Sequence, residues 1–215
     1  YYLSMINLTN AIPFAEGGNR KCFVHPEDKN KCVKVINAES FDKRINNLPW
    51  YKRFKDNSAF DDNLKEEKGY LQHALIDQDS KTWKHIAKWY GIVETTIGPG
   101  AVTELIRNNG DIAITLEQYL FKNGLTPEVK LAIENFHDWL RETLVLTKNL
   151  IPHNLVLKTD NGEIIMKIID GLGSKSFIPL PNKSNFFAKQ YVERRIQLMW
   201  SRINWDLSGR KGNWK

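Results

Sequence analysis

Two short hydrophobic runs near residue 161 constrain this chain more than any other feature, because together they fit a β-hairpin. The runs LVL (155–157) and IIMKII (164–169) flank the sequence Asp-Asn-Gly, which is typical of a tight hairpin turn. Asn154 stands just before the first run, and Asp170 just after the second. Antiparallel pairing therefore predicts that both oxygen-bearing side chains lie at the same end of the hairpin.

Asn154 and Asp170 offer an amide oxygen and a carboxylate, which are ligands for a hard divalent cation. A cation held there could also carry the phosphate of a nucleotide. Read separately, Asn154 is equally compatible with a turn, and Asp170 with a cap or turn before Gly171. The hairpin therefore indicates phosphate chemistry, and the rest of the chain has to decide between these alternatives.

The composition fits a folded protein with an anionic ligand. The chain has 215 residues, of which 41% are hydrophobic, so it can bury a core in one domain or in two small lobes. Lysine and arginine total 31 against 25 acidic residues, and the net charge of +6 suits a nucleotide. This moderate excess does not predict a nucleic acid as the main target.

The cysteines and the hydropathy pattern favour a cytoplasmic protein. Cys22 and Cys32 lack the spacing of a metal site, so we expect free thiols in a reducing compartment. No apolar run approaches the roughly 20 residues of a transmembrane helix, and we see no signal-peptide pattern. The basic side chains near the end of the chain leave peripheral contact with a membrane surface open.

Strand patterns dominate the first half of the chain. A glycine-containing turn precedes a predicted hairpin, and a Gly-Pro turn separates two later strand candidates. Apolar spacing predicts a helix over residues 63–74, whereas residues 38–62 show no clean period and are expected to be irregular. The predicted strands cover residues 20–24, 31–36, 89–96 and 101–106.

Helix patterns dominate the second half. Thr115 is a predicted N-cap, and Thr126 followed by proline starts a longer helix. The last residues, 209–215, are expected to form a frayed basic tail. The predicted helices cover residues 116–121, 126–146 and 185–207.

Lys34 lies within an apolar strand pattern, so it needs an anionic partner if its side chain is buried. A buried lysine without a partner costs several kcal/mol or loses its proton. Glu66 and Glu67, on the predicted helix that follows, are the candidate partners. Read alone, Lys34 is also compatible with an edge strand that faces solvent.

The order of these features resembles the protein-kinase-like fold, in which a glycine loop, a strand lysine and a helix glutamate precede the two metal ligands. The sequence is more closely similar to the YrbL family of bacterial PhoP regulatory network proteins, over about residues 6–205. The motifs that carry this similarity are RKCFVHPED (20–28), KCVK (31–34), LIPHN (150–154) and DGLG (170–173).

The resemblance implies a minimal bilobal kinase-like fold of the α+β class. Residues 1–106 would form a lobe with an antiparallel β-sheet, and residues 107–215 a mainly helical lobe. ATP and Mg²⁺ are the implied cofactors.

The first lobe would bind the phosphates of ATP. The backbone amides of Gly17 and Gly18 would cover them, and Arg20 would add positive charge. Lys34 would bind the α- and β-phosphates, held by Glu67 rather than by Glu66.

The adenine would lie against the segment from Thr103 to Ile106, where the Glu104 carbonyl and the Ile106 amide face its edge. Cys22 and Cys32 would roof the base as small apolar contacts. Simple burial of these two cysteines predicts the same exposure, so only contact with a nucleotide separates the two interpretations.

The resemblance makes Asn154 and Asp170 the ligands of Mg²⁺ and places Lys34, Asp170 and Asn149 in the catalytic machinery. Kinases have an aspartate as catalytic base at the position of Asn149. An amide cannot take up a proton from a substrate hydroxyl, although it can orient that hydroxyl by hydrogen bonding.

Two functions follow. The first is an ATP-dependent phosphotransferase acting on an unknown acceptor, which could be a small molecule or a glycan. The second is a regulator of the pseudokinase type, which binds a nucleotide without phosphotransfer and is read by a protein partner.

Overall fold

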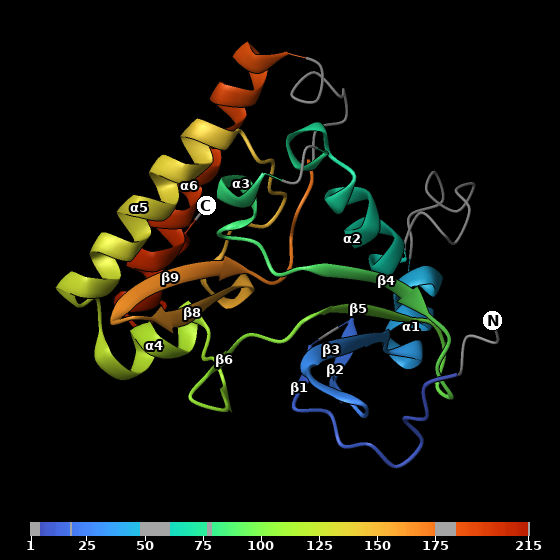
Figure 1. Cartoon of the computed structure of the whole chain (residues 1–215). Helices are drawn as coiled ribbons and strands as arrows, with labels where there is room; N and C mark the ends of the chain where they lie inside the picture. The colour runs from blue at the N-terminus through green and yellow to red at the C-terminus, as the bar shows by residue number, and fades with distance from the viewer. Residues whose placement is uncertain (1–4, 18, 48–60, 77–78, 175–183, 215) are drawn as a thin grey trace. The chain divides into compact units, whose positions relative to one another are not determined.

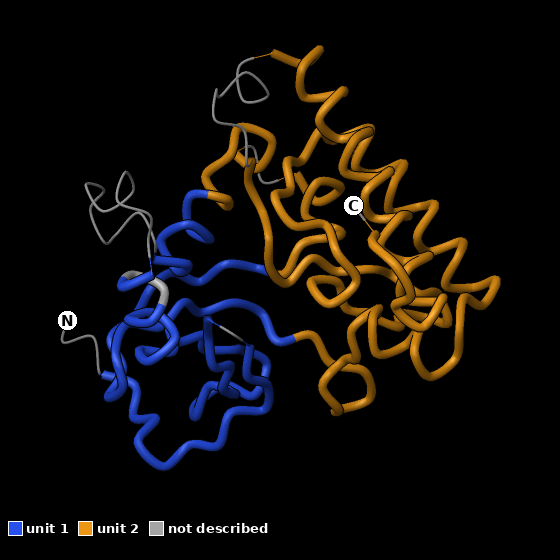
Figure 2. Tube along the Cα trace, turned by 180° about the vertical axis from the view of Figure 1, so that it is seen from behind, with its two compact units in different colours: residues 1–68, 88–105 blue, residues 69–87, 106–215 orange. Residues whose placement is uncertain are grey.

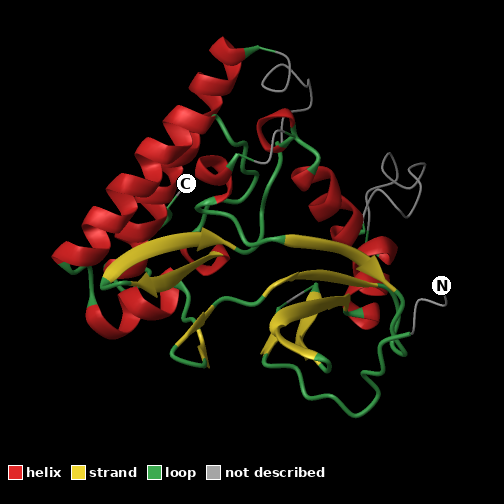
Figure 3. Cartoon of the chain, viewed as in Figure 1, coloured by secondary structure: helices red, strands yellow, loops and turns green. Residues whose placement is uncertain are grey.

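The computed structural model describes residues 5–17, 19–47, 61–76, 79–174 and 184–214. The chain divides into two compact units, which Figure 2 colours separately. Unit 1 consists of residues 1–68 and 88–105, and unit 2 of residues 69–87 and 106–215. Strands and helices occur in both units. Figure 3 colours them along the whole chain, and the predicted α+β class is confirmed.

Unit 1 is built on an antiparallel sheet with the strand order β1-β2-β3-β5-β4. Its strands are β1 (Ala15–Glu16), β2 (Arg20–His25), β3 (Asp28–Ile36), β4 (Trp89–Val93) and β5 (Gly100–Glu104). Side chains alternate between the faces of a strand, so Val33 and Val35 share one face of β3, and Cys32 and Lys34 share the other. The four predicted strands are therefore present, although β4 and β5 end earlier than predicted.

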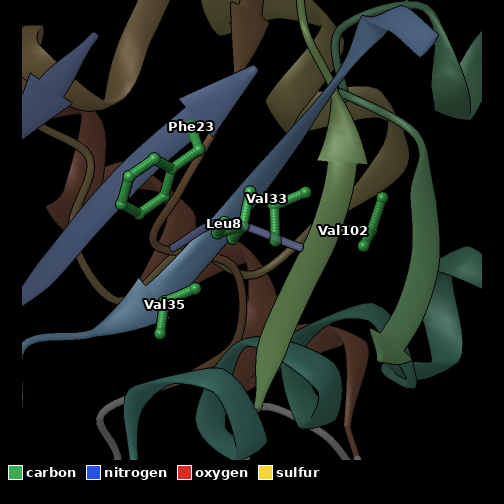
Figure 4. Packing of buried hydrophobic residues seen from close by; sticks show 5 residues of the cluster. All are labelled: Leu8, Phe23, Val33, Val35 and Val102. Carbon is green, nitrogen blue, oxygen red and sulfur yellow. The ribbon is translucent and has the colours of Figure 1, made fainter. Parts of the chain in front are cut away.

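The core of unit 1 covers one face of this sheet. Phe23 of β2, Val33 and Val35 of β3 and Val102 of β5 pack together with Leu8 (Figure 4). Burial of side chains of this size contributes roughly 1.5–3 kcal/mol each. Because the core fixes one face of β3, the direction of the side chains on its other face is fixed as well.

Residues 38–62, which we expected to be irregular, contain helical structure. Helix α1 (Ala38–Asn46) begins after Asn37, whose side chain accepts a hydrogen bond from the Ser40 N–H at 3.4 Å. The capping residue and the helical spacing of Ala38, Phe41 and Ile45 were usable signals that the prediction missed. Residues 48–60 lie outside the described residues.

Helix α2 (Asp62–Tyr70) begins within one residue of its predicted start but ends four residues earlier than predicted. Gln72 accounts for the early end. Its Nε2 donates to the Gly69 carbonyl at 2.8 Å, and its Oε1 accepts the Leu146 N–H at 2.6 Å. A buried glutamine thus caps the last turn of the helix and ties it to a distant segment.

Unit 2 combines helices with two small antiparallel sheets. Its elements are η3 (His73–Leu75), α3 (Ser80–Trp83), β6 (Arg107–Asn108), β7 (Asp111–Ile112), α4 (Leu116–Asn123), α5 (Pro127–Thr143), η4 (Pro152–Asn154), β8 (Leu155–Asp160), β9 (Glu163–Ile168) and α6 (Asn185–Leu207). Helices α5 and α6 lie side by side, and the β8–β9 hairpin packs against α4 and α5 (Figure 1).

The predicted helix starts of unit 2 are confirmed. The Thr115 hydroxyl accepts the Gln118 N–H at 3.1 Å, and the Thr126 hydroxyl accepts the Val129 N–H at 3.5 Å. Such N-caps satisfy backbone donors that have no partner inside the helix. Helix α5 ends before the predicted residue 146, because Leu144 adopts a left-handed conformation with φ of 54°.

The end of the chain is held in place, so the prediction of a frayed tail is wrong for its described residues. Glu117 of α4 accepts hydrogen bonds from Arg202 at 3.0 Å and from Arg210 at 2.7 Å. Asp206 binds the same two arginines at 3.2 Å and 3.1 Å. Two carboxylates and two guanidinium groups thus form a closed ring that joins the tail to α4 and α6.

None of the helices in the described ranges combines the length and the apolar character needed to cross a bilayer.

Two histidines of unit 2 are buried in the uncharged form. His85 lies with Nδ1 2.8 Å from the Met166 carbonyl oxygen, and its ring packs edge-on to Phe136. His137 on α5 contacts the Trp200 ring of α6. Burial lowers the pKa of both histidines from 6.5 to about 4.

We expect these histidines to make the protein less stable in acid. Their folded pKa of about 4 lies below 6.5, so the unfolded chain binds more protons between these values and stability falls as the pH drops through them. Each contributes at most about 1.4 kcal/mol per pH unit. Urea unfolding at a series of pH values measures this slope. The substitution His85→Gln should flatten it, and an unchanged slope would contradict the assignment.

Candidate functional site

Lys34 is buried in unit 1 and paired with a carboxylate. Its Nζ lies 2.6 Å from Oε1 of Glu66, and the two side chains are only 6% and 2% exposed. Strand β3 places Lys34 opposite Cys22 of β2 and Ala101 of β5. The alternative of a lysine on a solvent-facing edge strand is therefore wrong, since β3 has a neighbour on each side.

The partner of Lys34 is Glu66, which corrects the expectation of Glu67. Asn63, Glu66 and Tyr70 are 1%, 1% and 7% exposed, and their spacing of three and four residues places them on one face of α2. Glu67 is offset from this face and half-buried. Helical burial was thus a better guide to the partner than alignment with the kinase pattern.

Arg20 shares the same carboxylate. Its buried Nη1 donates to Oε2 of Glu66 and lies 3.3 Å from Oδ1 of Asn63. We expected Arg20 to add charge to the loop over the phosphates, but its side chain contacts helix α2 instead. The contacts of Arg20 with Asn63 and Glu66 were not foreseen, although the spacing of Asn63 and Glu66 on one helix face was a signal.

The loop between β1 and β2 is closed by its own backbone. The Gly17 N–H donates to the Arg20 carbonyl at 2.9 Å. This amide, expected to cover phosphates, is therefore engaged within the loop in this structure. Gly18, the other predicted contact, lies outside the described residues.

Cys22 and Cys32 are free thiols, as predicted, on the same face of the sheet as Lys34. A hydrogen bond between the two thiols, together with burial, raises the pKa of the Cys32 thiol well above its usual value. The Cys32 thiol is thus uncharged at neutral pH and suits an apolar surface. Their contact with adenine stays a prediction.

The predicted hinge, Thr103 to Ile106, begins within the last two residues of β5. Thr103 is 1% exposed, and the Glu104 N–H donates to the Lys88 carbonyl at 2.8 Å. The Ile106 carbonyl accepts the Ala113 N–H at 2.9 Å, but among the described residues the Ile106 N–H has no acceptor. A buried amide without an acceptor costs about 1–3 kcal/mol, so a ligand atom at this position would be stabilised. The predicted adenine contact fits this amide.

The hairpin of unit 2 brings Asn154 and Asp170 to one end, as its sequence predicts. Strands β8 and β9 pair in antiparallel register, starting from Leu155 opposite Ile168. Just beyond this pair, the Ile169 N–H donates to the Asn154 carbonyl at 3.0 Å. The two candidate metal ligands therefore flank one backbone hydrogen bond.

Both side chains are oriented by their neighbours. Asn154 is 7% exposed, and its Nδ2 donates to the Asn149 carbonyl at 2.9 Å. Within the described residues its Oδ1 accepts no hydrogen bond. Asp170 accepts the Gly171 N–H through Oδ1 at 2.6 Å.

This donor set fits Mg²⁺, which prefers oxygen ligands and commonly uses one or two carboxylates plus water and phosphate oxygens. No group of three or more His, Cys, Asp or Glu side chains suited to a metal exists in the part of the chain that the structure describes.

Gly171 allows the segment with Asn149 to approach the hairpin. It has φ of +88°, and a Cβ at this position would lie 2.8 Å from the Asn149 carbonyl oxygen. The Gly171 carbonyl accepts the Lys148 N–H at 2.7 Å. Asn149 is thereby held beside both candidate metal ligands. This role of Gly171 was not predicted from the sequence, where it stands only as the residue after Asp170.

Solved protein kinases share this fold. The Rad53 chain 1–466, in complex with AMP-PNP, matches 93% of this chain with a TM-score of 0.51 and 14% identity. A mutant PknI kinase domain from Mycobacterium tuberculosis matches 89% with a TM-score of 0.50 and 14% identity. This chain spans 48% of the Rad53 chain and 71% of the PknI chain. The protein therefore has a protein-kinase-like fold, and the predicted fold class is confirmed.

The sequence comparison identifies the family within this class. Residues 6–204 match the family described as PhoP regulatory network protein YrbL, so the chain belongs to the YrbL family. The proteins called YrbL in Escherichia coli (strain K12) and Shigella flexneri are each 26% identical to it over 205 residues. The matches cover 93% of this chain and 86% of each relative. The family resemblance seen in the sequence is confirmed.

The close approach at Gly171 can be tested with a matched pair of glycines. Gly171 and Gly162 both have positive φ, of 88° and 84°, but a Cβ at Gly162 would meet nothing within 4 Å. Gly171→Ala should therefore destabilise the protein by on the order of 1–3 kcal/mol more than Gly162→Ala in urea unfolding. Equal losses of unfolding free energy in the two variants would show that the contact with Asn149 does not restrict the residue at position 171.

Proposed function

We propose that this protein binds ATP with Mg²⁺ and transfers the terminal phosphoryl group to a small-molecule or glycan acceptor. The observation that carries the proposal is the buried Lys34–Glu66 pair in the sheet of unit 1. The nucleotide complex of Rad53, a protein of the same fold, supports the choice of ligand. An extended peptide is a less suitable acceptor, because the sequence passes from Gly173 to the start of α6 without room for a long activation segment.

The energetics of the Lys34–Glu66 pair favour a binding role. Removing one partner of a buried ion pair costs about 3–5 kcal/mol, whereas replacing both partners with apolar side chains is often neutral or stabilising. Stability alone is therefore a poor reason for such a pair. An ammonium fixed in direction by a carboxylate can donate charge-assisted hydrogen bonds to phosphate oxygens.

In this proposal Asn154 and Asp170 hold the cation. When bound, Mg²⁺ would neutralise the charge of the phosphates. The bond from Asn154 Nδ2 to the Asn149 carbonyl leaves Oδ1 for the metal, and the Gly171 N–H orients the carboxylate of Asp170. The unsatisfied amide of Ile106 would bind the adenine edge.

Asn149 would orient the acceptor hydroxyl without accepting its proton. Phosphoryl transfer passes through a loose transition state, so positioning and charge contribute more than a base does. We therefore expect slow transfer.

Asn149 also favours a second candidate, a nucleotide-binding regulator of the pseudokinase type. Such a protein would use the same Lys34 and Asp170 to bind ATP, and a partner would read the bound state. The two candidates share the nucleotide and differ only in turnover.

Nucleotide binding is tested by thermal shift and calorimetry with Mg²⁺ and ATP. Lys34→Met and Asp170→Ala should each weaken binding by roughly tenfold or more, because each removes a charge-assisted contact and 1.4 kcal/mol corresponds to a factor of ten. Removal of Mg²⁺ should have a similar effect on the wild type. The matched controls are Lys31→Met on the same strand and the exposed Asp160→Ala on the same hairpin, which should bind normally. A wild type with no response to Mg²⁺ and ATP would end the proposal.

The base position separates the two candidates. For a phosphotransferase, Asn149→Asp should raise the slow ATP turnover, by up to about a hundredfold, because it supplies a general base. Asn161→Asp makes the same chemical exchange in the exposed hairpin turn and should change nothing. Tight ATP binding with no turnover in the wild type or in Asn149→Asp would favour the regulator.

A further inference from the structure

Glu66 is bound by two cations, one on each carboxylate oxygen. Oε1 lies 2.6 Å from Nζ of Lys34, and Oε2 accepts a hydrogen bond from Nη1 of Arg20. The Arg20 side chain is 9% exposed. A carboxylate held through one oxygen can still turn about its last bond, whereas donors on both oxygens fix its plane and hence the direction in which it holds Lys34.

Asn63 connects this carboxylate cluster to the backbone. Its Oδ1 accepts from Nη1 of Arg20 at 3.3 Å, and its Nδ2 donates to the carbonyls of Lys34 at 3.3 Å and Pro99 at 3.2 Å. The oxygen and the nitrogen of the Asn63 amide are therefore both hydrogen-bonded. If the amide were turned over, its NH₂ group would face the N–H donor of Arg20. Helix α2 is thus fastened to β3 through Asn63 as well as through Glu66.

Arg20 also closes the loop that precedes β2. Its backbone carbonyl accepts the Gly17 N–H at 2.9 Å while its side chain reaches Glu66. One residue therefore connects the β1–β2 loop to the carboxylate that holds Lys34. Its neighbour Lys21 has the same charge, but its side chain is 41% exposed and pairs with Glu16 at 3.3 Å, outside this cluster.

We propose that Arg20 is a positioning residue for Lys34, acting through Glu66, and that it is not itself a ligand of the phosphates. The inference rests on the proposed nucleotide-binding function. Its basis is that the guanidinium is buried against two acceptors of α2. Loss of Arg20 would leave Oε2 of Glu66 without this donor, so Lys34 would be held less well for a phosphate.

The first test compares ATP with adenosine, which lacks phosphates. Arg20→Met should weaken Mg²⁺-dependent ATP binding by on the order of tenfold and leave adenosine binding unchanged. Lys21→Met removes the same charge from the next residue and should bind both compounds like the wild type. Weakening of both compounds by Arg20→Met would indicate a merely structural role and overturn the inference.

The second test is a double-mutant cycle with Glu66→Gln, measured by ATP calorimetry. If Arg20 acts through Glu66, Arg20→Met should have little further effect once Glu66 is replaced, whereas a direct phosphate ligand would lose the same factor in both backgrounds. Equal losses in the two backgrounds would therefore overturn the inference.

A conservative variant covers the case in which Arg20→Met does not fold. Arg20→Lys keeps the charge but loses the forked donors, so it should fold, retain adenosine binding and weaken ATP binding by roughly threefold to tenfold. Normal ATP binding by Arg20→Lys would then contradict the inference. If the wild type binds no ATP, the proposed function is contradicted. If the wild type and Arg20→Met bind ATP equally well, only this inference is contradicted.

Discussion

The carboxylate of Glu66 is the group on which the organisation of unit 1 depends. It is buried between Lys34 and Arg20, and a carboxylate in such a place must remain paired. Because its two oxygens bind different cations, Glu66 would stay paired with Arg20 even if a phosphate bound the ammonium of Lys34. Asn63 extends the cluster to the backbone of β3. An otherwise apolar sheet is thus joined to helix α2 by polar contacts that permit few alternative arrangements.

Unit 2 uses close backbone packing for the same purpose. Gly171 accepts the approach of Asn149, and Gly69 similarly accepts that of Leu172, whose carbonyl oxygen would lie 2.7 Å from a Cβ at Gly69. A glycine inside a helix costs about 1 kcal/mol relative to alanine. This cost at Gly69 is explained by Leu172, which packs against Gly69 and leaves no room for a larger side chain. The segment after Asp170 is therefore positioned by close packing rather than by charge.

The hairpin, its turn and the coincidence of Asn154 and Asp170 were predictable, because strand alternation and a two-residue turn determine register locally. The kinase-like fold followed from the order of motifs. The partner of Lys34 could not be predicted in this way, because choosing between the adjacent Glu66 and Glu67 requires knowing which face of α2 is buried. Arg20 and Gly171 escaped prediction for a related reason: their roles depend on contacts with residues 46 and 22 positions away, which no local pattern encodes.

The packing around Asn149 does not depend on the chemistry of its side chain. Its carbonyl accepts the side-chain amide of Asn154, and its backbone lies against Gly171. These contacts use main-chain atoms of Asn149, so they are the same for an amide or a carboxylate side chain. The residue at this position can therefore vary without disturbing the candidate metal ligands. A general base typically accelerates a reaction by a factor of about 10²–10⁴, whereas correct positioning of the reactants lowers the barrier by about 7–11 kcal/mol. The larger of these two contributions does not depend on the identity of this side chain.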